Sequence, residues 1–275
     1  MTDAKLKAGV FGWPVEHSKS PRLHGHWLKR YGVDGAYVHL PAEPDAFKTE
    51  VRRLAAAGWR GANVTIPHKE TALALADRMS DRARAIGAAN TLIFENGEIA
   101  ADNTDGYGFI ENLRAGAPTW RPDRPAAILG AGGASRAIIW SLIEAGAPAI
   151  RLSNRTRARA EALSDEFGPK VSVIEWDNRA DALADAGLIV NTTSLGMKGQ
   201  PPLELEFNAA PDDAIATDIV YTPLITPFLE QAEARGLTIV DGLGMLLHQA
   251  RPGFEAWFGA APEVDEELRA LMLAP

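Results

Sequence analysis

Short apolar runs alternate with amphipathic stretches along most of the chain, which is the pattern of strands alternating with helices. In the first hundred residues this pattern predicts strands at 6–11, 36–40 and 61–66 and helices at 21–31, 44–57, from 67 onward and at 80–86. Strands that alternate with helices need crossover connections, so the pattern predicts parallel strands covered by helices. We also expect Ser20 to cap the helix that Pro21 opens, leaving Ser18 on the loop before it.

Two apolar runs flank Asn96-Gly97, a pair of residues typical of a two-residue β-hairpin turn. The hairpin would bring Asn90-Thr91 at its start close to the stretch from Asp102 to Asp105 at its end. Polar side chains would therefore gather at the open end of the hairpin. Asp105 would also be able to cap a helix over 106–114.

The alternation resumes after a Pro-rich and charged segment at 114–124 that reads as a linker. It predicts strands at 149–153, 171–175, 188–191, 214–219 and 238–241 and helices ending at 145 and spanning 157–167, 180–186 and 223–235. This is the pattern of a doubly wound, Rossmann-type nucleotide-binding domain. We therefore expect an α/β protein of two domains, one formed by residues 1–113 with 243–275 and the other by 114–242, with the amphipathic tail packed on the first.

The stretch from Ala126 to Ala137 carries the clearest binding signal. An apolar run short enough for a buried strand ends at Gly130, Gly132 and Gly133 follow, and a helical pattern begins. Glycines at such a turn let the backbone approach a pyrophosphate, which then lies against the N–H groups of the helix N-terminus. Ser135 stands where the usual spacing has a third glycine.

The residues after the next strand indicate which dinucleotide binds. Proteins that bind NAD usually place an acidic residue there, about 20 residues past the glycines, to accept hydrogen bonds from the ribose 2′-hydroxyl. Here Asn154, Arg155 and Thr156 occupy this position, with Arg159 beyond them. Because guanidinium and hydroxyl groups suit a 2′-phosphate, the sequence favours NADP(H).

Composition removes several classes of function. The net charge is -8 with no basic run, which argues against nucleic acid or an anionic membrane as a partner. The chain has no cysteine, so disulfides, thiolate metal sites and a cysteine nucleophile are excluded. No apolar run approaches the roughly 20 residues of a membrane span and no signal-peptide core follows Met1, so we expect a cytoplasmic protein. His17, His24 and His26 lack a carboxylate at ligand spacing, and we expect no metal.

Lys69 is the candidate for acid–base chemistry in the first domain. It falls in the first turn of the helix that follows the strand at 61–66, at the strand's carboxyl end. Ligands of open α/β sheets bind at that edge. The helix dipole disfavours a cation there, which makes a lysine at this position unusual. Asp105 is the carboxylate that would pair with it.

The chain resembles the shikimate dehydrogenase family over nearly its whole length. The residues that carry the resemblance are S-K-S-P at 18–21, N-V-T-I-P-H-K at 63–69, A-A-N-T at 88–91, D-N-T-D-G at 102–106, G-A-G-G-A-S-R-A at 130–137, N-R-T at 154–156, N-T-T-S-L-G-M at 191–197 and D-G-L-G-M-L-L-H-Q-A at 241–250. Eight blocks in the family's order are far more specific than any one block. One departure is Gly25, where relatives often carry Asn.

The resemblance implies the roles of most site residues. It makes Lys69 and Asp105 the catalytic pair. The implied substrate-binding residues are these two together with Ser18, Ser20, Thr65, Asn90, Tyr221 and Gln249. It implies that the cofactor contacts Gly130, Ala131, Gly132, Gly133, Ala134, Asn154, Arg155, Thr156, Arg159, Thr192, Ser194, Ile219, Gly242 and Met245.

The activity implied by the resemblance is reversible, NADPH-dependent reduction of 3-dehydroshikimate to shikimate, a step toward chorismate and the aromatic amino acids. Two alternatives stay open: a quinate/shikimate dehydrogenase of broader specificity, and a non-catalytic NADPH-binding regulator, which would not need the Lys69 and Asp105 pair. We expect a small-molecule substrate and a monomer or homodimer. Which of Lys69 and Asp105 transfers the proton is not visible in the sequence.

Overall fold

The computed structural model describes residues 5–274, and the chain divides into two compact units. The first consists of the described residues up to Thr104 together with those from Leu247 onward, and the second of Asp105–Leu246. The expected division at 113/114 and 242/243 therefore needs correction. The reason is that α5 (Asp105–Gly116) packs within the second unit, where Gly106 lies against the backbone of Ala137 and the side chain of Ser141.

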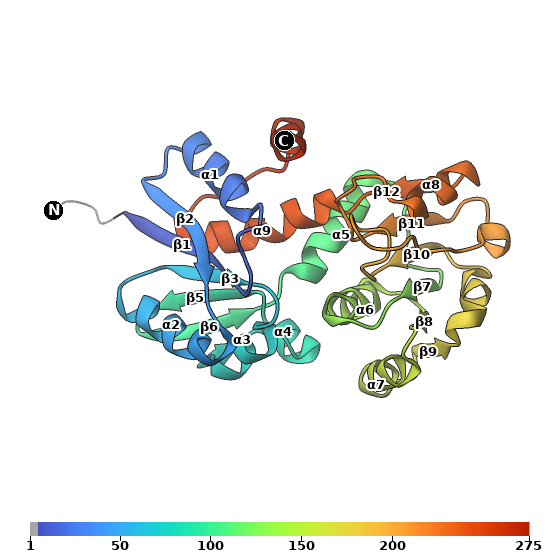
Figure 1. The fold of residues 1–275 in the computed structure, drawn as a ribbon, viewed down its shortest axis with the longest axis horizontal. Helices are drawn as coiled ribbons and strands as arrows, with labels where there is room; N and C mark the ends of the chain where they lie inside the picture. The colour runs from blue at the N-terminus through green and yellow to red at the C-terminus, as the bar shows by residue number, and fades with distance from the viewer. Residues whose placement is uncertain (1–4, 275) are drawn as a thin grey trace. The chain divides into compact units, whose positions relative to one another are not determined.

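A six-stranded sheet in the order β2-β1-β3-β5-β6-β4 forms the centre of the first unit (Figure 1). Its strands are β1 (Leu6–Gly12), β2 (Gly35–Pro41), β3 (Gly61–Val64), β4 (Arg78–Met79), β5 (Thr91–Glu95) and β6 (Glu98–Asp102). As predicted, β1, β2 and β3 are parallel and β5 and β6 form an antiparallel hairpin. Asn96 and Gly97 both have positive φ, as a type I′ turn requires. The short strand β4 was not predicted.

Helices cover both faces of this sheet. They are α1 (Ser20–Arg30), α2 (Pro44–Ala56), α3 (Lys69–Leu75), α4 (Asp81–Ile86), α10 (Glu266–Leu273) and the larger part of α9 (Leu243–Phe258). Phe47 and Leu54 of α2 join Phe11 in one buried cluster. On another strand, Gly61 lies against the indole of Trp257 in α9, and the Trp257 N–H donates to the carbonyl of Leu92 at 3.0 Å.

The C-terminal tail packs on the first unit, as expected from its amphipathic pattern. Lys19 donates to the carbonyl of Met272 at 3.0 Å, and Arg22 donates to the carbonyl of Ala274 at 2.8 Å. The indole N–H of Trp27 donates to the carbonyl of Glu263 at 3.1 Å. These contacts hold the tail against α1 and the loop before it.

The second unit contains a fully parallel six-stranded sheet in the order β12-β11-β10-β7-β8-β9. Its strands are β7 (Ala126–Leu129), β8 (Ile150–Ser153), β9 (Val171–Ile174), β10 (Leu188–Asn191), β11 (Ile215–Asp218) and β12 (Thr238–Val240). Read from β7, the chain winds outward to β9, returns to the other side of β7 and winds outward again. This is the Rossmann order, with the switch point between β7 and β10.

Alternate residues of these strands face two separate cores. Ala126 and Ile128 of β7 pack in the cluster that includes Ile138 and Leu142, whereas Ala127 and Leu129 pack in the opposite cluster. The first face is covered by α5, α6 (Gly133–Ala145) and α7 (Arg157–Phe167), and the second by η1 (Trp176–Leu183), η2 (Phe207–Ala209) and α8 (Pro227–Ala234). Figure 1 shows α6 and α7 on one side of the strands and α8 on the other. Burial on both faces explains why these strands read as short, continuous apolar runs.

Several predicted boundaries were wrong. The helix expected at 180–186 is the 3₁₀ segment η1, which begins earlier, at Trp176. The helix expected from Pro223 begins at Pro227, because the hydroxyl of Thr226 accepts from the N–H of Leu229 and caps it. Ser20 is the first helical residue of α1 and makes no cap, and Asp105 lies inside the first turn of α5.

Candidate functional site

The glycine turn of the second unit has the geometry expected of a phosphate-binding loop. Gly130 follows β7 with a φ of 113°, a backbone conformation that glycine adopts readily and other residues rarely do. A Cβ there would lie 2.6 Å from the hydroxyl oxygen of Thr192, so no other residue fits. At Gly132 and Gly133 a Cβ would meet nothing within 4 Å. Both glycines are exposed, so a ligand has room to approach the N-terminus of α6.

A cavity of about 360 Å³ lies beside this turn at the carboxyl ends of the strands. That is the edge, at the switch point of the sheet, where doubly wound folds bind their ligands. Seven of the fourteen expected cofactor residues line it: Gly130, Ala131, Gly132, Asn154, Arg155, Arg159 and Ser194. Trp176, Thr193, Leu195, Gln200 and Pro201 line it as well and were missed. Thr193 and Leu195 were detectable because they lie in the N-T-T-S-L-G-M block.

The side chains of Arg155 and Arg159 are exposed, and their guanidinium groups make no hydrogen bond or ion pair with other described residues. The arginine between them behaves differently, because Arg157 pairs with the carboxylates of Glu161 and Glu175. Two unpaired guanidinium groups on the rim of a cavity provide the charge and the bidentate donors that a phosphate monoester requires. This arrangement fits the 2′-phosphate of NADP(H).

Asn154 and Ser135 hold the turn in shape. The side-chain oxygen of Asn154 accepts from the N–H of Ala131 at 3.0 Å, and its amide donates to the carbonyl of Thr156 at 2.8 Å. The buried hydroxyl of Ser135 accepts from the N–H of Gly132 at 3.0 Å and lies 2.7 Å from the hydroxyl oxygen of Thr192. Ser135 therefore braces the loop at the position where related motifs use a third glycine.

The other expected cofactor residues lie outside the lining of that cavity. Thr192 is buried, and its hydroxyl donates to the carbonyl of Leu129 at 2.9 Å, so its observed role is to brace the turn. Gly242 allows a close backbone approach, since a Cβ there would lie 2.6 Å from the carbonyl oxygen of Ile219. Also outside the lining are Gly133, Ala134, Thr156, Ile219 and Met245.

In the first unit, three expected substrate residues lie at the carboxyl end of β3 or beside it. The N–H of Thr65 donates to the carbonyl of Phe11 at 2.9 Å, and Lys69 opens α3 four residues later. The carbonyl of Lys69 accepts from the N–H of Ala89 at 2.9 Å, next to Asn90. Thr65, Lys69 and Asn90 are thereby held in one neighbourhood of the first unit.

Buried His68 fixes the start of the helix that carries Lys69. Its ring stacks on Phe47 with centroids 4.3 Å apart, and its Nε2 donates to the carbonyl of Ala42 at 2.8 Å. Burial lowers the pKa of His68, so the neutral ring is favoured. Lys69 therefore follows an anchored residue.

Asn90 is the centre of a buried polar cluster. Its side-chain oxygen accepts from the N–H of Thr104 at 2.8 Å, and its amide donates to Gln249 Oε1 at 3.2 Å. The hydroxyl of Thr104 in turn donates to the carbonyl of Gln249 at 2.8 Å. The structure thus brings together the expected residues Asn90 and Gln249, which are 159 positions apart in the chain.

The stretch before Asp105 is held by an ion pair. Arg82 donates to Asp102 Oδ1 at 2.7 Å, and the hydroxyl of Ser80 donates to the same oxygen at 2.6 Å. Burial alone would raise the pKa of Asp102, but the hydrogen bonds from Arg82 and Ser80 lower it. The N–H of Asn103 also donates to this carboxylate, which fixes the chain two residues before Asp105.

Tyr221 lies in the second unit on the loop after β11. The loop is anchored by Asp218, whose carboxylate accepts from Thr226 at 2.6 Å and from Asn191 at 3.0 Å. Burial raises the pKa of Asp218, and it raises that of Tyr221 as well. Tyr221 therefore keeps its phenolic proton as a donor near neutral pH.

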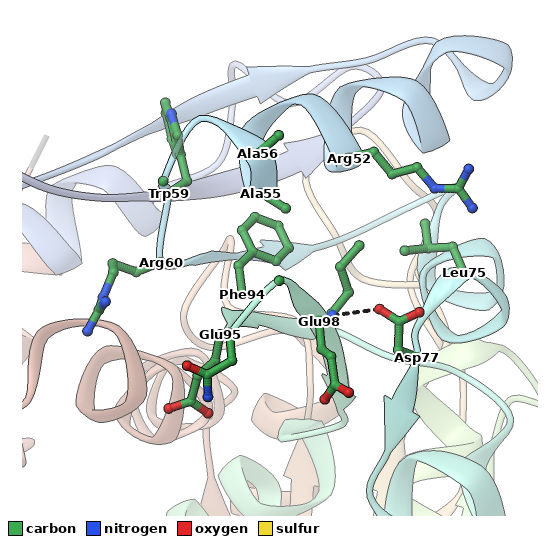
Figure 2. Close-up of a pocket in the computed structure, with 14 residues that line it drawn as sticks. Arg52, Ala55, Ala56, Trp59, Arg60, Leu75, Asp77, Phe94, Glu95 and Glu98 are labelled. Atoms are coloured by element: carbon green, nitrogen blue, oxygen red, sulfur yellow. Dashed lines mark hydrogen bonds between the residues drawn. The ribbon is translucent and has the colours of Figure 1, made fainter.

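A larger cavity of about 770 Å³ lies in the first unit but contains none of the expected site residues (Figure 2). It is at the turn end of the β5–β6 hairpin, whereas Asn90 and Asp102 are at the open end. In Figure 2 the side chains of Arg52 and Arg60 extend to opposite sides, and the N–H of Ile99 donates to Asp77 at 2.8 Å. Its size therefore does not identify it as the reaction site.

Among residues 5–274, no group of three or more His, Cys, Asp or Glu side chains could hold a metal ion. Within that same part of the chain, no helix is long and apolar enough to cross a membrane. His24, one of the three histidines considered above, is buried among aromatic rings instead.

Two protein-family models match the chain. The shikimate dehydrogenase substrate-binding domain matches residues 10–92, and the shikimate/quinate 5-dehydrogenase model matches residues 121–198. Among curated proteins, the NADP(+) shikimate dehydrogenase of Paracoccus denitrificans is 59% identical over 269 residues, covering 97% of this chain and 95% of that protein. The corresponding enzyme of Dinoroseobacter shibae is 59% identical over the full length of both chains.

Solved structures agree with these matches. Shikimate 5-dehydrogenase from Thermus thermophilus, in complex with NADP(H) and shikimate, superposes with a TM-score of 0.85 at 36% identity, covering 97% of each chain. Quinate dehydrogenase from Corynebacterium glutamicum, in complex with NAD, superposes with a TM-score of 0.90 at 28% identity, covering 98% of this chain and 99% of that one.

Proposed function

Because this chain belongs to the shikimate dehydrogenase family, we propose that it catalyses the reversible, NADPH-dependent reduction of 3-dehydroshikimate to shikimate, a step in the biosynthesis of chorismate and the aromatic amino acids. The observation that carries this proposal is 59% identity, over the whole chain, to NADP(+) shikimate dehydrogenases. The unpaired Arg155 and Arg159 beside an open glycine turn support the choice of NADP(H). The protein is an NADP-dependent oxidoreductase.

We propose that the pyrophosphate lies against the N–H groups of Gly133 and Ala134 at the start of α6, since the N–H of Gly132 donates to Ser135 Oγ. Arg155, Thr156 and Arg159 would hold the 2′-phosphate, and Ser194 would lie along the same wall of the cavity. The bound cofactor supplies the hydride for reduction of the substrate ketone.

Lys69 is proposed to donate the proton that the developing alkoxide requires, with Asp105 orienting the ammonium group and balancing its charge. In the oxidation direction the same pair would remove the hydroxyl proton. Lys69 is half-buried and opens α3, and Asp105 follows directly on Thr104, which is bonded to Asn90. A lysine and a carboxylate on such anchored backbone suit a site that must hold a proton donor still.

The remaining polar residues are proposed to bind the substrate's hydroxyl and carboxylate groups. They fall into one pair at the entrance of α1, one group around β3 and Asn90, and Tyr221 on the loop after β11. The proposed set is Ser18, Ser20, Thr65, Asn90, Tyr221 and Gln249. Groups that are already hydrogen-bonded to one another lose little conformational freedom when a polyhydroxylated ring binds.

Steady-state assays of shikimate and quinate oxidation with NADP⁺ and with NAD⁺ test this proposal. We expect kcat/KM with NADP⁺ to be at least about tenfold higher for shikimate, because the extra hydroxyl of quinate needs space and a partner in a polar site. Comparable values for the two substrates would assign the broader quinate/shikimate specificity. No turnover of either, with NADPH still bound, would favour the non-catalytic regulator.

The proposal also covers the cellular compartment and the oligomeric state. We propose that the protein acts in the cytoplasm, where an NADPH-dependent biosynthetic enzyme has its reductant, and cell fractionation tests this. We also propose a monomer or homodimer, which light scattering on the purified protein distinguishes from larger assemblies.

A further inference from the structure

Two loops of the second unit follow adjacent parallel strands and carry groups proposed to bind different ligands. The loop after β10 lines part of the cavity beside the glycine turn, and the loop after β11 carries Tyr221, a proposed substrate residue. Asn191 is the last residue of β10 and Asp218 the last of β11, and they are partners in the register of the sheet. Both are buried, and neither was among the residues expected to act in the site.

The carboxylate of Asp218 holds the loop after β11 on both sides of Tyr221. On the near side, Asp218 Oδ1 accepts from the N–H of Val220 at 2.9 Å. On the far side, Asp218 Oδ2 accepts from the hydroxyl of Thr226 at 2.6 Å, and Thr226 is itself buried at the start of α8. Tyr221 therefore lies on a stretch of backbone that one buried carboxylate closes into a loop.

Asn191 holds the loop after β10 in a similar way. Its Oδ1 accepts from the N–H of Thr193 at 2.9 Å and from the hydroxyl of the same residue at 2.8 Å. Its amide donates to the carbonyl of Leu195 at 3.2 Å. Thr193 and Leu195 both line the cavity beside the glycine turn. Asn191 therefore sets the shape of this part of the cavity wall.

Hydrogen bonds join the two loops to each other. The amide of Asn191 donates to Asp218 Oδ2 at 3.0 Å, so one buried bond connects the two residues that hold the loops. A second link is the N–H of Lys198, which donates to the carbonyl of Thr222 at 2.9 Å, one residue past Tyr221. The backbone around Tyr221 is therefore fixed relative to the wall of the cavity beside the glycine turn.

We propose that Asp218 is a positioning residue that sets the place of Tyr221 relative to the cavity proposed to hold the cofactor. The inference rests on the proposed function, in which Tyr221 binds the substrate. Asp218 is buried, so it acts through Asn191 and through the loop that carries Tyr221. Hydride transfer requires substrate and cofactor to be held in a defined mutual position, and an anchor shared by the two binding surfaces provides this.

Asp218→Asn is the direct test, because it keeps the size of the side chain and changes one oxygen into an NH₂ group. The partners of the carboxylate are all donors, so the new NH₂ group must face either the N–H of Val220 or the amide of Asn191. One anchor is therefore lost whichever way the amide is turned. We expect the KM for shikimate to rise roughly tenfold and that for NADP⁺ roughly threefold, with kcat changed less than about threefold.

Ser164→Ala is the matched control within the same unit. The hydroxyl of Ser164 donates to the carbonyl of Val171 at 2.6 Å, at the first residue of β9 and thus at the opposite edge of the sheet from the two loops. The control should lose stability and keep both KM values. Unchanged KM values in Asp218→Asn, or equal rises in the control, would overturn the inference.

Exchanging the two partners separates positioning from general loosening of the fold. In the double variant that combines Asn191→Asp with Asp218→Asn, the amide at position 218 is able to donate to the carboxylate at position 191, so the bond between the strand ends forms in the reverse direction. We expect its KM for shikimate to be about threefold or more below that of Asp218→Asn. A KM as high as that of the single variant, or higher, would contradict positioning through this bond.

Tyr221→Phe shows where a negative result originates. If this variant has a raised KM for shikimate and Asp218→Asn does not, the substrate assignment of Tyr221 stands and the positioning role of Asp218 is refuted. An unchanged KM in Tyr221→Phe would overturn the inference too, and would locate the failure in the substrate assignment of Tyr221. A wild type that does not turn over shikimate would refute the proposed function itself.

Discussion

The hydroxyl of Ser135 lies 2.7 Å from that of Thr192, and both side chains are buried beneath the glycine turn. Ser135 also accepts from the N–H of Gly132, and Thr192 donates to the carbonyl of Leu129. The two hydroxyls tie the loop after β7 to the loop after β10, on either side of the switch point. A third glycine in place of Ser135 would have no side chain with which to do this.

We predict that Ser135→Gly weakens NADP⁺ binding roughly five- to tenfold, because the variant loses about 1 kcal/mol of hydrogen bonding that holds the turn ready. Isothermal titration calorimetry with NADP⁺ measures the change. Ser141→Ala is the control, since Ser141 is buried in the same helix and donates to the carbonyl of Ile138 instead. Equal affinity losses in both variants would contradict a specific role for Ser135.

Replacing Arg155 and Arg159 with glutamine should weaken NADPH binding roughly 10- to 100-fold per lost charge-assisted contact and leave NADH binding nearly unchanged. Fluorescence titration with each cofactor measures both affinities. Arg157→Gln serves as the control because its guanidinium is paired with Glu161 and Glu175. If NADPH and NADH lost affinity equally, these arginines would not bind the 2′-phosphate.

Lys69→Ala should lower kcat by about 10² to 10⁴, the usual effect of losing an acid–base group, while NADP⁺ binds nearly as before. The comparison is Lys48→Ala, which removes an exposed lysine on α2. Pre-steady-state hydride transfer and equilibrium cofactor binding separate the two effects. Near-normal turnover with lost cofactor affinity would remove Lys69 from the catalytic role.

His24 should make the protein sensitive to mild acid. Its pKa is lowered by burial to about 3 in the folded chain against about 6.5 when exposed, so the unfolded chain binds the extra proton between these values. The free energy of unfolding therefore falls as pH drops through this window, by about 2 kcal/mol between pH 7 and pH 5. The group is fully buried, so solvent screening does not reduce this effect.

Urea unfolding of the wild type and of His24→Phe at pH 7, 6 and 5 measures this contribution. Phenylalanine keeps an aromatic ring against Tyr37 and cannot be protonated. The stability of the wild type should fall relative to the variant as pH decreases, whereas parallel curves would contradict the prediction. Carboxylates with lowered pKa, such as Asp102 and Asp265, lose their contribution only below about pH 4 and do not interfere.

Features that depend on neighbouring residues were predictable from the sequence. The turn at Gly130 to Gly133 lies between a strand and a helix that are contiguous in the chain, and Asn96-Gly97 defines its hairpin without reference to the rest of the fold. Arg155 stands after β8, where NAD-binding proteins usually carry an acidic residue. Recognising this difference likewise requires only the order of the strands along the chain. Hydrophobic periodicity then predicts the layers, because each face of a sheet or helix must be buried somewhere.

Other features depended on groups that only tertiary packing brings together. Trp176 lines the cavity beside the glycine turn because a 3₁₀ segment begins where the pattern predicted the end of a strand. Tyr37 and Asn63 are 26 positions apart, and Asn90 and Gln249 are 159 apart, yet each pair shares a hydrogen bond. Hydrogen bonds between side chains depend on distance and direction in space, which sheet order and helix packing set, and no local pattern in the chain encodes them. The sequence by itself determined which chemical groups are available and which strand ends carry them, and the tertiary structure decided which of them touch.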